Sequence, residues 1–227
     1  SAEWVARAER LDREVHSSGS RLMLVRWLAA SWRLDEAEAA LDTILLEEDK
    51  LMGTDTVAHA CLSAGLLDQA ITLFEKNLAD SERILGPDHP DTLTSRNNLA
   101  RAYLSAGMLE QAINLHEQNL ADIGRILGPS HPDILAARNN LARAYLSAGM
   151  LEQAINLHEQ ISTDFERVLG PDHPDTLASR NNLARAYQDA DRLEQAIPLF
   201  EQNLTDSEHV LGPDHPDTLT SRNNLAR

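Results

Sequence analysis

The chain has 227 residues, of which 42% are hydrophobic and 25% are charged, and this composition is typical of a folded protein with a sizeable core. Aromatic residues make up only 4%, and the abundance of Ala and Leu favours helices over sheets. The formal net charge of -16 argues against general binding to nucleic acid or acidic membrane surfaces.

Cysteine usage and hydropathy indicate the compartment. The single cysteine, Cys61, cannot form an intrachain disulfide, and the first residues lack a secretory pattern. No apolar run approaches the length that is needed to span a bilayer. We therefore expect a cytoplasmic protein that does not bind membranes.

Residues 1–50 are expected to form N-terminal capping helices and a degenerate helix pair. Apolar residues in the segment 2–15 have helical spacing, a helix is expected from about Arg21, and "RLDEAEAALDTIL" from Arg33 predicts its partner. All three tryptophans lie here, and we expect them either to seal this end of the fold or to contact an upstream domain: Trp4, Trp27 and Trp32.

Residues 51–84 predict a helix pair that is a degenerate copy of the units that follow. The phrase "LSAGLLDQAI" keeps a turn at Gly65 between two helical segments, and Cys61 stands where later units have Tyr.

From Leu85 onward the chain repeats itself. "LGPDHPDTL" begins at Leu85, Leu169 and Leu211, and "LGPSHPDIL" begins at Leu127, so successive units start 42 residues apart. A fixed period of this size predicts stacked units, because one unit cannot bury its own apolar face. The expected units are 85–126, 127–168, 169–210 and a partial unit 211–227.

Each unit predicts two helices. In the first unit, Gly86 and Pro87 end the preceding helix, Asp88 is expected to cap the next one, and Pro90 lies in its first turn. We expect a first helix over about 89–106 and, after Gly107, a second helix over about 109–127. The buried side is predicted to consist of Leu93, Leu99, Ala100, Tyr103 and Ala106 in the first helix, and of Leu109, Ala112, Ile113, His116, Leu120, Ile123 and Leu127 in the second.

The pattern "L-A-x-A-Y-x-x-A-G-x-x-x-x-A-I" resembles a tetratricopeptide repeat (TPR), with its key positions at Leu99, Ala100, Tyr103, Gly107 and Ala112. The common repeat has a period of about 34 residues. The longer form found here, with "NNLA" and "LGxDHPD", is similar to kinesin light chains and to the repeat arrays of bacterial signalling ATPases of the STAND class. The resemblance implies an all-α, right-handed solenoid of antiparallel helix pairs (a TPR superhelix). It also implies a non-enzymatic protein–protein interaction module in a larger bacterial signalling or sensor protein.

The sequence departs from the family at two repeated positions. The large aromatic residue near the start of the first helix is replaced by Arg96, Arg138, Arg180 and Arg222. The usual Phe of the second helix survives as Phe74 and Phe200 but becomes His116 and His158 in the middle units, where we expect half-buried rings with polar tips at the surface.

Metal binding and catalysis find no support in the sequence. The histidines of the "HPD" loops occur once per unit, whereas a metal needs several converging ligands, so we expect them to structure the loops: His89, His131, His173 and His215. There is no phosphate-binding glycine loop and no supported Ser–His–Asp set. We expect no enzyme, no metal and no cofactor.

The resemblance places the first helices on the concave surface of the array, and it therefore implies a peptide-binding groove. An Asn amide can bond the backbone of an extended peptide, and Arg can bind carboxylates. The groove is predicted to consist of Asn97, Asn98, Arg101, Ser105, Asn139, Asn140, Arg143, Ser147, Asn181, Asn182, Arg185, Asn223, Asn224 and Arg227.

Charge placement predicts the ligand of this groove. From Leu85 onward there are eleven Arg, no Lys and twenty Asp or Glu, and eight of the Arg occupy the two positions of "RNNLAR". A cationic inner stripe is therefore expected, which suits an acidic peptide or a C-terminal carboxylate. In the alternative interpretation, the Asn pairs bond each other between repeats and the Arg96 set lays its stems over the helix interface.

Two segments of 23 residues, 96–118 and 138–160, are identical. Recent duplication and consensus design both explain this identity. Similar units have similar stacking faces, so end-to-end self-assembly is a second expected function. The chain stops in the middle of a first helix at Arg227, and we expect either a fragment of a longer array or an end that another molecule completes. Otherwise Leu219 and Leu225 would face water.

Overall fold

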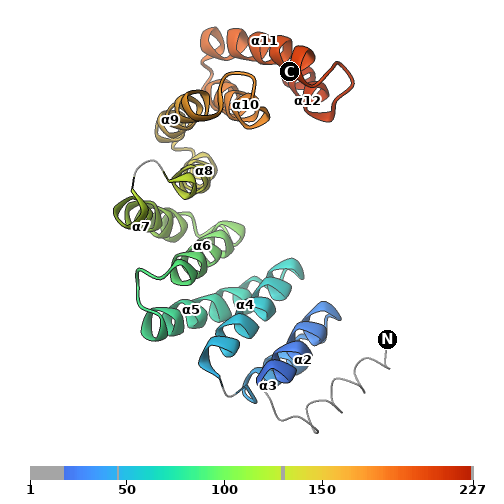
Figure 1. The fold of residues 1–227 in the computed structure, drawn as a ribbon, viewed down its shortest axis with the longest axis vertical. Helices are drawn as coiled ribbons and strands as arrows, with labels where there is room; N and C mark the ends of the chain where they lie inside the picture. Colours follow the sequence, from blue (N-terminus) through green and yellow to red (C-terminus); the bar gives the residue numbers. More distant parts are fainter. Residues whose placement is uncertain (1–17, 45, 129–130, 226–227) are drawn as a thin grey trace. The chain divides into compact units, whose positions relative to one another are not determined.

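The computed structural model describes residues 18–44, 46–128 and 131–225. In these residues all regular structure is helical, with eleven helices and no strand (Figure 1). The expected all-α fold class is therefore confirmed. The segment 2–15 with Trp4, and Arg227 of the predicted groove, lie outside the described residues.

The chain divides into two compact units, one up to Asp122 and one from Ile123, with the boundary inside helix α7 (Leu109–Leu127). Unit 1 also contains α2 (Ser18–Ala30), α3 (Leu34–Leu41), α4 (Glu47–Ser63), α5 (Leu67–Ile84) and α6 (Pro90–Ser105). Unit 2 also contains α8 (Pro132–Ser147), α9 (Leu151–Leu169), α10 (Pro174–Asp189), α11 (Leu193–Val210) and α12 (Pro216–Leu225).

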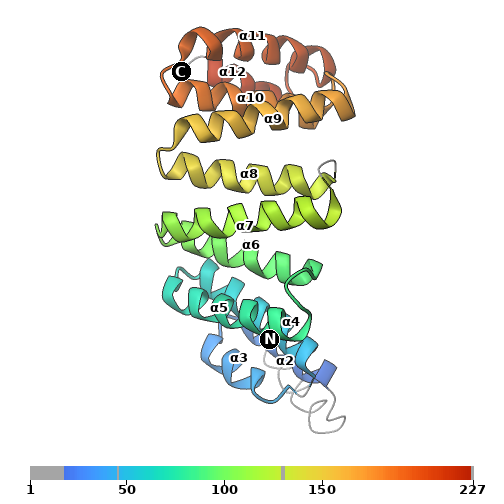
Figure 2. The ribbon, with the colours of Figure 1, turned by 90° about the vertical axis from the view of Figure 1, so that its left-hand side faces the viewer.

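Helices that follow one another in unit 1 pack side by side. Helix α2 packs against α3 and α4, α4 against α5, and α5 against α6 (Figure 2). Val25, Val57 and Phe74 are fully buried in the core that these helices share. Trp27 is half-buried and packs against this core, but Trp32 is 59% exposed, so the expectation that it seals the N-terminal end is wrong.

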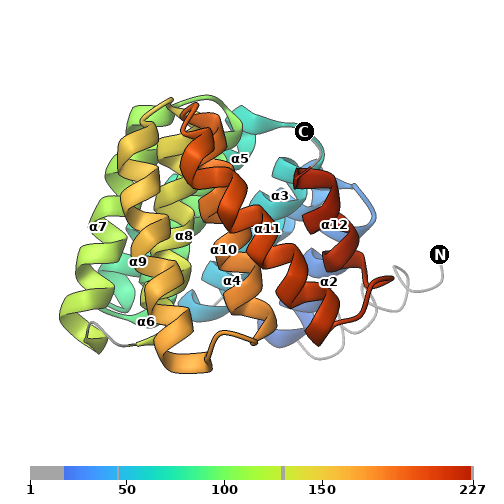
Figure 3. The same cartoon turned by 90° about the horizontal axis from the view of Figure 1, so that it is seen from above.

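Unit 2 has the same arrangement. Each helix from α8 to α12 packs against the next, and α10 also contacts α12 (Figure 3). A core of Ile155, Leu183, Tyr187 and Phe200 lies between α9, α10 and α11. First and second helices therefore alternate along the chain in both units, as the 42-residue period predicts.

Local sequence signals determine the helix ends. Gly86, with a φ of 91°, follows α5, and Gly107, with a φ of 73°, separates α6 from α7. These left-handed conformations suit glycine, which has no Cβ. Helix α7 has the predicted bounds of 109–127, and Pro90 is the first residue of α6, as expected.

The residue that caps each first helix differs from the expectation. His89, not Asp88, is the N-cap of α6, and its Nδ1 accepts a hydrogen bond from the backbone N–H of Asp91 at 3.1 Å. The same bond, at 3.2 Å, is made by His131, His173 and His215. An imidazole nitrogen thus satisfies one of the donors that every helix start leaves open, and the expected role of these histidines in structuring the loops is confirmed.

Seven of the twelve residues predicted on the buried side are buried, and Tyr103, Ala106, Leu109 and Leu120 are only partly buried. Ala100 and Ala112 are fully buried, which allows close approach of their helices. Leu127 is 40% exposed because it is the last residue of α7. His116 and His158 are not half-buried, because they fill the core position that Phe74 and Phe200 fill in the other repeats.

Candidate functional site

The paired asparagines of the first helices are partly used inside the fold. In unit 1, Asn98 on α6 is buried, and its Nδ2 donates to Asp55 Oδ1 on α4 at 3.0 Å. In unit 2, Asn224 Nδ2 on α12 donates to Asn181 Oδ1 on α10 at 3.1 Å. Both bonds join the second position of one pair to the first position of the preceding repeat. The alternative interpretation, bonding between repeats, therefore holds for these residues.

The other predicted groove residues differ in exposure. Ser105, Ser147, Asn182, Asn223 and the three arginines Arg101, Arg143 and Arg185 are exposed, and Asn97, Asn139, Asn140, Asn181 and Asn224 are partly exposed. The Ser105 hydroxyl donates to the backbone carbonyl of Arg101 at 3.0 Å, so its hydrogen is already used. Whether these residues bind a peptide remains a prediction.

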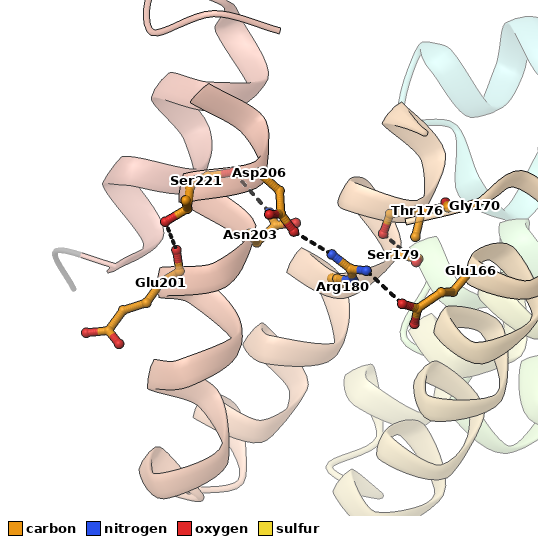
Figure 4. Close-up of polar contacts among 10 residues, drawn as sticks. Glu166, Gly170, Thr176, Ser179, Arg180, Glu201, Asn203, Asp206 and Ser221 are labelled. Carbon is orange, nitrogen blue, oxygen red and sulfur yellow. Dashed lines mark hydrogen bonds and ion pairs between the residues drawn. The ribbon is translucent and has the colours of Figure 1, made fainter. Parts of the chain in front are cut away.

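Arginine at the family's aromatic position forms ionic bridges between second helices. Arg180 Nη1 lies 2.7 Å from Asp206 Oδ2 on α11, and its Nη2 lies 3.0 Å from Glu166 Oε1 on α9 (Figure 4). Arg96 makes the same two contacts in unit 1, to Asp122 at 2.7 Å and Glu82 at 3.2 Å. Both guanidinium groups are buried and neutralised, as buried charges must be.

The two other members of this set have one described carboxylate contact each. Arg138 Nη1 lies 2.6 Å from Asp164, and Arg222 Nη2 lies 2.6 Å from Glu208. Burial disfavours the charged carboxylate of Asp164, but hydrogen bonds from Arg167 and Arg138 outweigh it and hold its pKa below the ordinary value. The predicted cationic stripe of eight arginines is therefore wrong for the Arg96 set, because carboxylates of the second helices neutralise it.

The second arginine of each repeat is different. Arg101, Arg143 and Arg185 are exposed, and none of their guanidinium groups forms a hydrogen bond or an ion pair in the part of the chain that the structure describes. They lie toward the C-terminal half of α6, α8 and α10. In α6, α8 and α10 these three side chains are cations that can bind a ligand without breaking a described internal bridge.

The described residues give little support for metal binding, a reactive thiol or a membrane-spanning helix. No group of three or more His, Cys, Asp or Glu among them could hold a metal ion. Cys61 is buried, and burial raises the pKa of its thiol, which disfavours the reactive thiolate. None of the described helices is long and apolar enough to cross a membrane.

Sequence reasoning placed His116 on the buried side of its helix but underestimated how deeply the two histidine rings are buried. His158 is buried among apolar side chains, its Nδ1 has no hydrogen-bond partner among the described residues, and burial lowers its pKa. The equivalence with Phe74 and Phe200 was visible in the sequence, and it indicated a fully buried position more strongly than the polarity of His indicated a half-buried one.

Comparison with known proteins identifies the family. A family model described as tetratricopeptide repeat matches residues 48–121 and 111–163, and a second model with the same description matches residues 176–217. The chain belongs to the tetratricopeptide-repeat family. No catalytic family is among the matches, and the typical role of the family is protein interaction.

Solved tetratricopeptide-repeat structures share this fold. A candidate kinesin light chain of Podosopora anserina with nearly identical TPR-like repeats is 31% identical, with a TM-score of 0.72, and the match covers 89% of this chain and 97% of that one. BtubC (BKLC) from P. vanneervenii is 19% identical, with a TM-score of 0.72 and coverage of 95% and 91%. The expected kinesin-light-chain-like form of the repeat is confirmed.

A more distant tetratricopeptide-repeat structure is that of YrrB, described as having an unusual peptide-binding site. It is 14% identical, with a TM-score of 0.58, and the match covers 95% of this chain and 96% of that one. No curated protein sequence gives a significant match to this chain.

Proposed function

We propose that this tetratricopeptide-repeat chain is a non-enzymatic interaction module that binds an extended acidic peptide along its first helices. The observation that carries the proposal is the contrast between two arginines of each repeat. The Arg96 set is neutralised by carboxylates, whereas Arg101, Arg143 and Arg185 are exposed and have no described partner. A protein of net charge -16 that keeps free cations at one repeated position has a local preference for anions.

Partly exposed amides beside these arginines supply the second element of recognition. Asn139 and Asn181 precede Arg143 and Arg185 by four residues, so each Asn and its Arg lie on the same face of α8 or α10. An amide at this position can bond a peptide backbone, and the guanidinium can bond a neighbouring carboxylate. The peptide-binding site described for YrrB supports peptide recognition by this fold.

The test is binding of a fluorescein-labelled Glu-Ser repeat peptide, followed by fluorescence anisotropy. The triple variant Arg101→Glu, Arg143→Glu, Arg185→Glu is expected to lose binding while its far-ultraviolet circular dichroism stays helical. The matched control has the same change of charge on second helices: Lys76→Glu, Arg83→Glu and Arg167→Glu, whose native side chains are exposed. Equal binding by both variants, or equal binding of a Gln-Ser peptide to the native chain, would refute the acidic-peptide proposal.

Self-assembly is the second candidate, favoured by one observation. Leu219 on α12 is 42% exposed, whereas Leu93 and Leu177 at the same repeat position are buried. End-to-end stacking of a second copy would cover this residue. Light scattering against concentration tests it: the native chain is expected to associate and Leu219→Glu to stay monomeric, and a native chain that is monomeric at high concentration contradicts the idea.

The biological setting is also a proposal. The resemblance to the repeat arrays of STAND signalling ATPases supports a cytoplasmic sensor or scaffold part of a larger bacterial signalling protein. The buried, unpaired Cys61 is compatible with a reducing compartment.

A further inference from the structure

A pocket opens between three helices of unit 1. It has a volume of about 460 Å³ and lies between the first half of α4, the second half of α5 and the start of α6. Leu51, Met52 and Leu85 form its apolar wall. This volume is within the range of about 300–1,000 Å³ that ligand pockets usually have.

Asn77, one of the residues that line the pocket, has a buried acceptor that the fold leaves unused. Asn77 is 3% exposed, and its Nδ2 donates to Ser95 Oγ at 3.4 Å. Its Oδ1 is buried and has no hydrogen-bond partner in the described part of the chain. A buried amide oxygen without a donor is costly, so a donor that reaches it from a ligand would be stabilising.

The same arrangement recurs in unit 2, where a second bond fixes the orientation of the amide. Asn203 Nδ2 donates to Ser221 Oγ at 3.2 Å, and Ser221 Oγ donates its only hydrogen to the backbone carbonyl of Asp217 at 3.1 Å. Ser221 can therefore only accept from Asn203, which leaves the Asn203 Oδ1 as the unused atom.

The two pockets are copies made by the repeat. Ten of the eleven residues that line the pocket of unit 2 stand three 42-residue periods after a residue that lines the pocket of unit 1. The copy in unit 2 is smaller, at about 100 Å³. The space and the unused amide oxygen are therefore properties of the repeat, and the residues that vary between the copies determine what each copy can bind.

Charge distinguishes the two copies. The pocket of unit 1 is lined by Glu48, Asp55 and Asp91, and no Lys or Arg is among its lining residues. The equivalent positions in unit 2 are Pro174, Asn181 and Asp217. Two carboxylates are thus specific to the first pocket.

Internal contacts leave the carboxylates of Asp55 and Asp91 partly available to a ligand. Asp55 Oδ1 accepts from Asn98, and Asp55 Oδ2 lies 3.7 Å from His59 Nε2. Asp91 Oδ2 lies 3.8 Å from His89 Nδ1. This nitrogen accepts a hydrogen bond from the backbone N–H of Asp91, so it carries no proton. The carboxylate of Asp91 is therefore not neutralised by that histidine.

We propose that the pocket of unit 1 binds a lysine side chain of the peptide ligand, an inference that rests on the proposed peptide-binding function. The aliphatic stem packs along Leu51, Met52 and Leu85, and the ammonium group donates to the surrounding carboxylates and to the Asn77 amide oxygen. An ammonium group has three donors and no acceptor, which matches a lining of oxygen acceptors. Lysine stems commonly cover apolar surface in this way while the charged end reaches polar partners.

The pocket and the arginine site are separable. Thr94, at the pocket, and Arg101 are seven residues apart on α6, which is about 10 Å along a helix. A ligand that uses both sites therefore carries its lysine and its acidic residues at different points, and variants of one site leave the other intact.

The experiment uses N-acetyl-lysine methylamide as the probe, with the norleucine and arginine analogues as comparisons. Amide shifts of Thr94 and Ser95 in the full chain, measured by nuclear magnetic resonance, report binding. The lysine probe is expected to give a saturable shift, whereas the norleucine analogue, which has the stem without the charge, gives none. Equal shifts from lysine and norleucine, a stronger response to arginine, or a response to Ca²⁺ that lysine does not compete with would overturn the proposal.

Two substitutions already present elsewhere in the chain test the residues. Asp55→Asn reproduces Asn181, which still accepts from the second Asn of the next repeat, so the fold keeps its bond and loses only the charge. Asn77→Ile reproduces the buried Ile161 at the same repeat position. Each substitution is expected to weaken binding of the lysine probe about tenfold, because it removes a charged or buried hydrogen-bonding partner. Unchanged binding in both variants would overturn the inference.

The acidic-peptide assay on the same samples distinguishes this failure from failure of the proposed function. Asp55→Asn and Asn77→Ile are expected to leave binding of the Glu-Ser peptide unchanged, while the triple Arg→Glu variant keeps the lysine shift. A native chain that binds the lysine probe but not the acidic peptide refutes the acidic ligand and keeps the pocket. A native chain that binds the acidic peptide but not the lysine probe refutes the lysine pocket alone.

Discussion

The Tyr103 hydroxyl on α6 donates a hydrogen bond to Glu75 Oε1 on α5 at 2.7 Å. Tyr187 on α10 makes the same bond to Glu159 on α9 at 2.5 Å. Each bond joins the first helix of one repeat to the second helix of the preceding repeat. Burial, followed by the hydrogen bond to the carboxylate, raises the pKa of each phenol to about 12.

These tyrosines make the fold sensitive to alkali. The phenol ionises near pH 10 in the unfolded chain and only near about 12 in the fold, so the stabilisation is complete below pH 10 and is lost as the pH rises toward 12. Urea denaturation at increasing pH is expected to show this loss, and it should be smaller in the Tyr103→Phe, Tyr187→Phe double variant. Tyrosinate absorbance that develops fully near pH 10 would contradict the prediction.

Arg138 lacks a Glu at the position that supplies the second carboxylate to Arg96 and Arg180, and this difference predicts a stabilising substitution. Arg96 and Arg180 each contact a Glu that lies fourteen residues earlier, but Arg138 has Gly124 at that position. A Cβ at Gly124 would meet Ile134 Cδ1 at 3.6 Å, an ordinary contact. Gly124→Glu thus fits the space and supplies the second carboxylate for Arg138.

We expect Gly124→Glu to raise the free energy of unfolding by about 1 kcal/mol, mostly because glycine is unfavourable inside a helix and partly through the new ion pair. Urea denaturation measures the change. Gly124→Gln is the matched control, since it restores helix propensity without charge, and it should gain somewhat less. A destabilised Gly124→Glu protein would mean that the bridge of unit 2 cannot accept a second carboxylate.

His158 predicts an acid-sensitive core. Burial lowers its pKa below the ordinary value of 6.5, so the unfolded chain binds the proton more readily than the fold. Stability is therefore complete above pH 6.5 and falls as the pH drops below it. His158→Phe, which copies Phe200, is expected to flatten this part of the curve of unfolding free energy against pH, and an unchanged slope would show that the residue does not titrate with folding.

The histidine caps predict a loss of stability on truncation. His89→Ala removes the side chain that accepts from the Asp91 N–H, and N-cap removal typically costs about 1 kcal/mol. His89→Asn keeps an acceptor at the cap and should retain most of the stability in urea denaturation. If both variants were equally destabilised, the loss would come from packing of the ring and not from the cap.

Much of the fold could be predicted from the sequence, because helix ends depend on local signals. The Gly–Pro phrases, Pro90 and the apolar spacing predicted α7 at its observed bounds of 109–127 and α6 to within one residue at each end. The cap was assigned one residue too early, since Asp is the commoner capping residue and an imidazole cap depends on ring orientation. The 42-residue period predicted stacked helix pairs, and this too follows from spacing alone.

The partners of polar residues depended on the tertiary structure. Arg180 bonds Glu166 and Asp206, and Asn98 bonds Asp55, across helices whose lateral register no local pattern specifies. For this reason eight repeated arginines read as one cationic stripe in the sequence, although the fold neutralises the Arg96 set. The sequence by itself determined the repeat, which is visible as a fixed spacing, and the helix boundaries, which rest on contacts within a few residues of one another. Only the packing of neighbouring helices decided which charges remain free and that Asn77 lies in a pocket, because hydrogen bonds and burial act between residues far apart in the chain.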